Sequence, residues 1–286
     1  MTTNTLKTRD DHVPLQFRAD DDTFKLQAGS EASWLSGEAF GHKELRSRIE
    51  PWLTSLFQSE HLSLLAGSGL THAVHYLAAG KGAAGMGNLT LSNHQAEINH
   101  AAEKAAGAAG RKKGNLEDQL RVANELLRGL EILQKDSEAE ALRNELQAGM
   151  QDFAKSILGS EAGIATAEEG KREQAFNTLV TFLMSFASRT GVRDRVNIFT
   201  TNYDRLIEAG AELAGLHLLD RFLGNLMPIF RSSRLDLDMH YNPPGIRGEP
   251  RYLEGVARYT KLHGSVDWVQ TGKDIRRIGL PFGADS

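Results

Sequence analysis

In the C-terminal three quarters of the chain, short apolar runs typical of strands alternate with segments that have the hydrophobic spacing of a helix. Short apolar runs at 61–66 and 196–199 each end at small polar or glycine residues, and a helical pattern follows at once. A third run, at 259–262, ends at His263 and Gly264, with another strand pattern at 266–269. Strand, turn and helix in repetition are typical of an α/β layer fold with a parallel sheet. We therefore expect a Rossmann-like parallel sheet flanked by helices over residues 60–286.

A long helical pattern separates the first strand from the second. From about residue 96 to residue 186, Ala, Glu, Leu, Lys and Gln dominate, and apolar residues recur at three- and four-residue steps. The segment is too long for one crossover helix. We expect a large helical insertion of several segments, broken near 107–114 and again near 159–170.

The N-terminal segment shows weaker patterns. Residues 1–40 are polar and have no sustained period, which predicts an irregular arm. Residues 44–58 have helical spacing, with Pro51 as a candidate break. Residues 80–95 are flexible by composition, and 228–250 resemble a loop because they are rich in Gly and Pro. The predicted domains are thus an arm and helix at 1–59 and a larger domain at 60–286.

Composition narrows the class of protein. The 286 residues carry a formal net charge of -4, with both signs spread along the chain, so no dominant nucleic-acid surface is indicated. The absence of cysteine excludes disulfides and a cysteine-based zinc site. The N-terminus is polar, and no apolar run approaches the roughly 20 residues of a membrane helix. We expect a soluble cytoplasmic protein without membrane association or zinc.

The first strand leads into a glycine loop. Gly67 and Gly69 would let backbone N–H groups approach a phosphate at a helix N-terminus, but they also suit an ordinary tight turn. The dehydrogenase fingerprint requires a third glycine where His72 stands, and the phosphate-loop pattern of NTPases is absent. The loop alone leaves both interpretations open.

The second strand ends in a cluster of small polar residues. Thr201 and Asp204 have the spacing of a helix capping box, which is the favoured interpretation on spacing alone. Capping does not explain Asn202, whose carboxamide offers both a donor and an acceptor to a ligand.

Histidines provide further candidates. His263 stands at the end of the third strand, where a lone histidine is more often structural than catalytic. Only its combination with the other two loops favours a catalytic role. His72 and His75 lie one helical step apart but lack a third ligand, so we predict no metal there. Asp236, Asp238 and His240 alternate in a pattern that can bind a divalent ion, although a solvent-facing strand edge is the simpler explanation.

Together, the three loops resemble the motifs of the sirtuin superfamily. GSGLT (67–71) resembles the family's G-A-G-x-S, TTNYD (200–204) resembles its T-Q-N-x-D, and His263-Gly264 resembles its catalytic His-Gly. IFTTNYD, YTKLHGSVDW and the helical insertion are similar to a bacterial anti-phage branch. The sirtuin-like protein of that branch operates with a HerA-type hexameric ATPase.

The chain also departs from the family. It lacks the four-cysteine zinc module of deacetylating sirtuins, and HAVHYLAAGK stands where they have a G-I-P-D-F-R-type stretch. These differences favour water over acetyl-lysine as the attacking group. The chain ends at LPFGADS where family members continue, so we expect a domain truncated at its C-terminus.

The resemblance implies NAD as the substrate and assigns roles to the loops. Asn202 would clamp the ribose and orient water, His263 would accept a proton, and Asp204 would lie near the nicotinamide ribose or remain a cap. The expected catalytic residues are Asn202, His263 and Asp204. The expected cofactor-binding residues are Gly67, Ser68, Gly69, Thr71, Thr200, Thr201, Asn202, Gly264 and Ser265.

The sequence therefore predicts an NAD glycohydrolase that depletes NAD in anti-phage defence. The resemblance implies a homo-oligomer and a HerA-type ATPase partner. Two alternatives stay open: a non-catalytic subunit that binds NAD or ADP-ribose, and a nuclease-type effector of the same complex, for which binding of nucleic acid is undecided.

Overall fold

The computed structural model describes residues 3–8, 11–20, 23–85, 87–188, 194–233, 237–245, 248 and 250–284. Two compact units are present. The N-terminal unit extends to Leu62 and includes Asp194, and the second unit begins at Ser63. Within the described ranges, every helix is too short or too polar to cross a bilayer.

The N-terminal unit is a small sheet followed by one helix. Its strands are β1 (Thr3–Leu6), β2 (Leu15–Asp20), β3 (Thr23–Leu26) and β4 (Ala39–Gly41), which pair antiparallel in chain order, and the helix is α1 (His42–Phe57). Its core consists of Leu15, Phe17, Phe24 and Phe40. The expectation of an irregular arm over 1–40 is wrong, since this segment contains β1, β2, β3 and most of β4. Its apolar positions are few and separated by polar turns, so the sequence shows no sustained period there. The break expected at Pro51 is also wrong, since α1 continues through it.

The second unit contains a parallel sheet of four strands. These are β5 (Ser63–Ala66), β6 (Asn197–Thr200), β12 (Val256–Lys261) and β7 (His217–Leu219), in the order β5-β6-β12-β7. The register aligns Ala66 and Lys261 with Thr200. The loops that follow β5, β6 and β12 therefore leave the sheet at one edge, where open α/β sheets bind ligands.

In the described part of the connection from β5 to β6, the chain forms five helices. They are α2 (Ser68–Ala79), α3 (Gln95–Ala108), α4 (Leu116–Ile132), α5 (Asp136–Ala165) and α6 (Glu169–Ala187). The first predicted break, near 107–114, is present. The second is shorter than expected because Gly159 and Gly163 lie inside α5, and the turn between α4 and α5 at 133–135 was not predicted.

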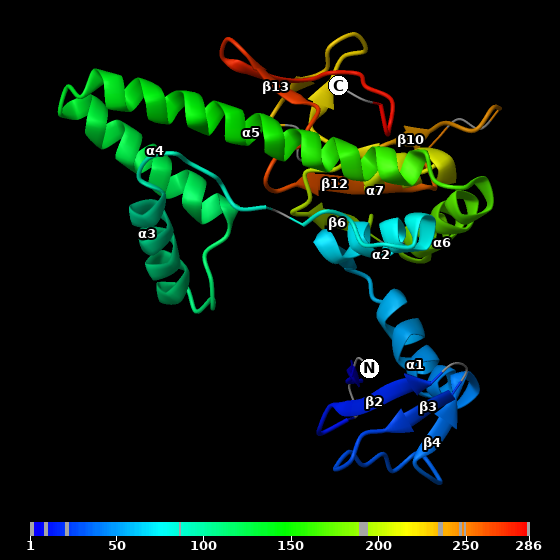
Figure 1. Ribbon diagram of the computed structural model, residues 1–286. Coiled ribbons are helices and arrows are strands. Elements are labelled where there is room, and N and C mark those ends of the chain that lie inside the picture. The colour runs from blue at the N-terminus through cyan, green and yellow to red at the C-terminus, as the bar shows by residue number, and fades with distance from the viewer. Residues whose placement is uncertain are drawn as a thin grey trace. The chain divides into compact units, whose positions relative to one another are not determined.

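Helices α3, α4 and α5 form a bundle with its own core. Buried leucines and isoleucine from these helices meet Leu89 and Leu91 there, and Phe153 packs against the cluster. On another side, α2 packs on α6, and α6 packs on α7 (Leu206–Ala214) (Figure 1). The α3–α5 bundle is thus a packed element in its own right.

The second unit also contains an antiparallel sheet, whose strands come before and after β12 in the chain. Its strands are β8 (Phe222–Leu223), β9 (Ile229–Phe230), β14 (Asp274–Arg277) and β13 (Trp268–Thr271). A separate hairpin pairs β10 (His240–Tyr241) with β11 (Arg251–Tyr252). The segment at 228–250, expected as loop, therefore carries two short strands. The strand predicted at 266–269 begins later, at Trp268.

Candidate active site

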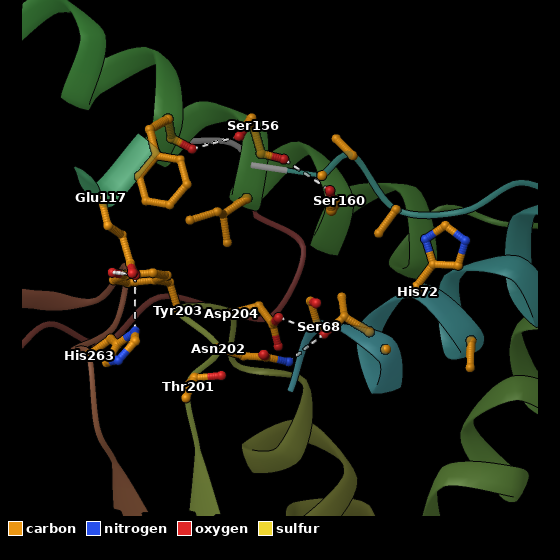
Figure 2. A pocket seen from close by; sticks show the side chains of 18 residues that line it. Ser68, His72, Glu117, Ser156, Ser160, Thr201, Asn202, Tyr203, Asp204 and His263 are labelled. Atoms are coloured by element: carbon orange, nitrogen blue, oxygen red, sulfur yellow. Dashed lines mark hydrogen bonds and ion pairs between the residues drawn. The ribbon is translucent and has the colours of Figure 1, made fainter. Parts of the chain in front are cut away.

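A cavity of about 520 Å³ opens where β5, β6 and β12 end (Figure 2). Its volume lies within the range of small-molecule sites. Loops from three separate parts of the sequence meet there. Seven of the residues expected from sequence line it: Ser68, Gly69, Thr71, Thr201, Asn202, Asp204 and His263.

Asn202 lies just beyond β6, and only 7% of it is exposed. Its backbone N–H donates to Thr200 Oγ1 at 3.0 Å, and its Nδ2 donates to Gly67 O at 3.0 Å and Thr71 Oγ1 at 2.9 Å. Both side-chain hydrogens are thereby used. No donor among the described residues reaches Oδ1, so this oxygen is the atom that Asn202 offers to a ligand.

Asp204 supports this arrangement through its carboxylate. Its Oδ2 accepts a hydrogen bond from Thr71 Oγ1 at 2.7 Å, and its Oδ1 accepts one from Leu206 N at 3.1 Å. The carboxylate thus stabilises the first turn of α7 and the Thr71 hydroxyl together. The predicted capping box is wrong in detail, because the helix begins after Arg205 and Thr201 makes no cap.

The N-terminus of α2 forms another part of the cavity lining. Ser68 and Gly69 lie in the first turn, after Gly67 as the N-cap residue. A Cβ atom added to Gly69 would meet no atom within 4 Å. Open space therefore faces this helix end, whose N–H groups carry the partial positive charge that favours anions.

The segment after α2 closes another side of the cavity. Gly80, at a φ of 69°, ends α2, and Ala83, Ala84 and Gly85 line the cavity. A second cavity of about 320 Å³ shares Gly85, Phe153 and Ser156 with the first. The two spaces thus adjoin along α5.

His263 faces the cavity from the loop after β12. Gly264, at a φ of 97°, turns the chain directly behind it. The imidazole Nδ1 lies 3.0 Å from Glu117 Oε1, and the Tyr203 hydroxyl donates to the same oxygen at 2.8 Å. Among the described residues, none contacts Nε2 through an ion pair or hydrogen bond. This nitrogen is the one that remains for a ligand.

Four of the residues expected to bind cofactor lie behind the lining rather than in it: Gly67, Thr200, Gly264 and Ser265. The Gly67 carbonyl and the Thr200 hydroxyl both hold Asn202. Ser265 donates to Tyr203 O at 3.2 Å. Gly67, Thr200 and Ser265 therefore support residues of the lining.

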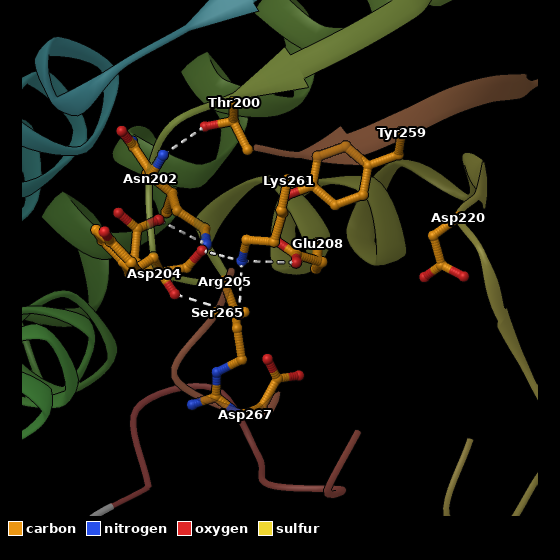
Figure 3. Close-up of polar contacts among 12 residues, drawn as sticks. Thr200, Asn202, Asp204, Arg205, Glu208, Asp220, Tyr259, Lys261, Ser265 and Asp267 are labelled. Carbon is orange, nitrogen blue, oxygen red and sulfur yellow. Dashed lines mark hydrogen bonds and ion pairs between the residues drawn. The ribbon is translucent and has the colours of Figure 1, made fainter. Parts of the chain in front are cut away.

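A buried lysine joins the loops after β6 and β12 (Figure 3). Lys261 Nζ donates to Asp204 O, to Glu208 Oε1 at 2.9 Å and to Ser265 Oγ at 2.8 Å. Burial raises the pKa of Glu208, while the lysine charge acts in the opposite direction. Tyr259 donates to the other carboxylate oxygen at 2.9 Å. The network fixes one loop against the other.

Sequence reasoning missed the side of the cavity that the helices contribute. Its residues are Glu117 from α4 and Phe153, Ser156, Ile157 and Ser160 from α5. Glu117 stands in the first turn of α4, where an acidic residue is expected from the helix dipole alone. No local signal therefore marked it as part of a site.

Two of the metal candidates, His75 and Asp238, have other partners. In the described ranges, no group of three or more His, Cys, Asp or Glu side chains could hold a metal ion. His75 Nδ1 is bonded to Lys81 O at 2.8 Å, and Asp238 pairs with Arg195 at 3.0 Å. Asp236 lies outside the described residues. In the described part of this pattern, an arginine already holds the carboxylate of Asp238.

No protein-family model matches this chain, and no curated protein is significantly similar to it.

Proposed function

We propose that this protein is an NAD glycohydrolase, which cleaves NAD into nicotinamide and ADP-ribose. The observation that carries the proposal is the meeting of the chain segments after β5, β6 and β12 in one cavity. The N-terminus of α2, Oδ1 of Asn202 and Nε2 of His263 are all available to a ligand there. This combination provides an anion site, a polar acceptor and a proton acceptor.

The reaction places modest demands on the protein. The nicotinamide ring nitrogen is cationic in NAD, so it leaves as a neutral molecule and requires no general acid. The transition state resembles an oxocarbenium ion, as in glycoside hydrolysis. The protein must hold the ribose, orient a water and accept its proton.

The available groups divide these tasks. The amide of Asn202 takes up no proton near neutral pH, so its Oδ1 accepts a hydrogen bond from a ribose hydroxyl or the attacking water. The imidazole of His263 takes the proton as water adds to the ribose carbon and the bond to nicotinamide breaks. The N-terminus of α2 binds the pyrophosphate.

The wider context rests on the sequence resemblance. We propose that the parallel sheet is Rossmann-like and that α3–α6 correspond to the insertion of the anti-phage sirtuin-like proteins. A role in phage defence, a homo-oligomer and a HerA-type ATPase partner follow from the same resemblance.

The test is nicotinamide release from NAD, measured with and without a HerA-type ATPase. We expect His263→Ala to lower kcat by about 10²- to 10⁴-fold, the range for loss of a positioned proton-transfer group. We expect Asn202→Ala to lower it by about 10²- to 10³-fold, the range for loss of one hydrogen-bonding group that stabilises the transition state. Asn144→Ala and His100→Ala, which change exposed residues on α5 and α3, serve as matched controls. Circular dichroism checks that each variant is folded.

Two results would overturn the proposal. Unchanged turnover in both site variants would remove these residues from the mechanism. NAD binding without turnover in every assembly would favour the alternative of a non-catalytic binding subunit.

A further inference from the structure

One carboxylate connects α4 to both loops that carry the proposed chemistry. Glu117 Oε1 lies 3.0 Å from Nδ1 of His263 and accepts the Tyr203 hydroxyl at 2.8 Å. Tyr203 follows β6 and His263 follows β12, so the contact joins three elements (Figure 2). Glu117 belongs to no motif in the sequence.

We propose that Glu117 is the positioning residue of His263. It holds the imidazole in the tautomer with a proton on Nδ1, and thereby leaves the Nε2 lone pair to the cavity. The consequence for catalysis rests on the proposed function, whereas the choice of tautomer does not.

The chemistry of the two groups leads to this assignment. An ionised carboxylate offers only lone pairs, and its Oε1 lies 3.0 Å from Nδ1. A neutral imidazole therefore keeps its hydrogen on Nδ1, because a lone pair on that nitrogen would face a negative oxygen. The remaining nitrogen, Nε2, then bears the lone pair. An imidazole without such a partner is free to place its hydrogen on Nε2. In that tautomer, Nε2 has no lone pair with which to accept a proton.

Tyr203 leaves this arrangement undisturbed. Burial, the hydrogen bond to Glu117 and the carboxylate charge raise the pKa of Tyr203 to about 12. The phenol therefore stays protonated at neutral pH and acts toward Glu117 as a donor. Its ring also packs edge-on against Phe153, with centroids 5.2 Å apart, which fixes its direction.

The backbone around Glu117 is held on both sides. Asn115 and Asp118 form a reciprocal capping box at 3.0 Å in each direction, and Arg111 binds both Asp118 oxygens at 2.7 Å. Leu116 is buried in the core of the α3–α5 bundle. The bundle therefore determines where the carboxylate of Glu117 lies.

A purely structural role makes a different prediction. An acidic residue in the first turn of a helix stabilises it through the dipole by about 0.3–1 kcal/mol. Removing such a residue would lower stability slightly and would leave the histidine tautomer unchanged. The tautomer of His263 therefore separates the two roles.

The experiment is nitrogen-15 NMR of the histidine side chains at a pH where they are neutral. The signal of His263 is assigned by its loss in His263→Gln. We expect the Nδ1–H tautomer in the unaltered protein and the Nε2–H tautomer in Glu117→Ala. In Glu117→Gln, the side-chain oxygen can still accept from Nδ1, so we expect the Nδ1–H tautomer to return.

Kinetics provide the second measurement. We expect Glu117→Ala to lower kcat for NAD cleavage by about 10- to 100-fold, below the full effect of a lost proton acceptor, with KM changed less than about twofold. Glu117→Gln should recover much of this loss. Glu125→Ala is the matched control, because this residue lies on the same helix and pairs only with the exposed Arg121.

The outcomes are distinguishable. An unchanged tautomer in Glu117→Ala, with the fold intact, overturns the inference even if NAD is cleaved. A shifted tautomer supports it even if no variant cleaves NAD, in which case the proposed function alone fails. If KM also rose at constant kcat while the tautomer stayed unchanged, Glu117 would be assigned to substrate binding instead.

Discussion

The cavity has two walls that differ in origin and in chemistry. The sheet wall consists of the loops after β5, β6 and β12 and carries small polar groups and His263. The helical wall consists of α4 and α5 and carries apolar side chains, two serines and Glu117. In Figure 2, Asn202 and Thr201 lie opposite Ser156 and Ser160. In the proposed reaction, the sheet wall carries the reacting groups, whereas the helical wall covers the substrate and orients His263.

The two walls are joined by two sets of charged contacts. In the first, Glu117 reaches the loops after β6 and β12. In the second, Glu161 of α5, which is 1% exposed, accepts hydrogen bonds from the backbone N–H and the guanidinium of Arg205. Arg205 also donates to Leu280 O, which anchors the last described segment. Both α4 and α5 are thus held against the sheet wall.

The largest expected effect comes from breaking the support of the sheet wall. Lys261→Met leaves the half-buried carboxylate of Glu208 without its cationic partner, which we expect to lower the free energy of unfolding by about 1–3 kcal/mol. Denaturant unfolding measures it. Lys273→Met, at an exposed position, is the matched control.

A double variant sharpens this prediction. Adding Glu208→Gln to Lys261→Met removes the uncompensated charge, so part of the lost stability should return. A change below about 0.5 kcal/mol in Lys261→Met would mean that the buried network does not hold the sheet wall.

A smaller effect is expected from the helical wall. Phe153→Ala removes an aromatic face from the cavity and its packing on Tyr203. We expect KM for NAD to rise about 3- to 10-fold while kcat changes little, because an apolar cover contributes equally before and during the reaction. Steady-state nicotinamide release measures both constants.

Met150→Ala is the control for this wall. Met150 lies on the same helix, outside the cavity lining, and is 46% exposed. If Phe153→Ala instead lowered kcat as strongly as Asn202→Ala or His263→Ala, the helical wall would take part in the chemical step. The assignment of separate roles to the two walls would then be wrong.

The smallest expected effect is in the alkaline titration of Tyr203, which reports the contact between the walls. Its pKa of about 12 exceeds the ordinary value of 10.0, so its contribution to stability is complete below pH 10.0 and is lost as the pH rises to about 12. Phenolate absorbance, with Tyr203→Phe subtracted, measures the transition. In Glu117→Gln, the transition should move to lower pH, and an unmoved transition would contradict the contact.

Sequence patterns predicted some elements better than others. The strand at 196–199 and the helix from Leu206 lie close to the observed β6 and α7, because a compact apolar run and a 3.6-residue period are local signals. The N-terminal sheet was missed because Phe17, Phe24 and Phe40 form a core only when three strands pair. Each strand by itself offers too few apolar positions to show a period.

The sequence by itself determined that Asn202 and His263 would follow strands and that a glycine turn would open α2, since short-range apolar patterns and turn residues suffice for that. Only the tertiary structure decided that Glu117 would contact Tyr203, which is 86 positions away, and that Lys261 would be paired with Glu208. The physical reason is that strand register and helix packing bring these side chains together. Both depend on contacts across the whole unit, which no local pattern records.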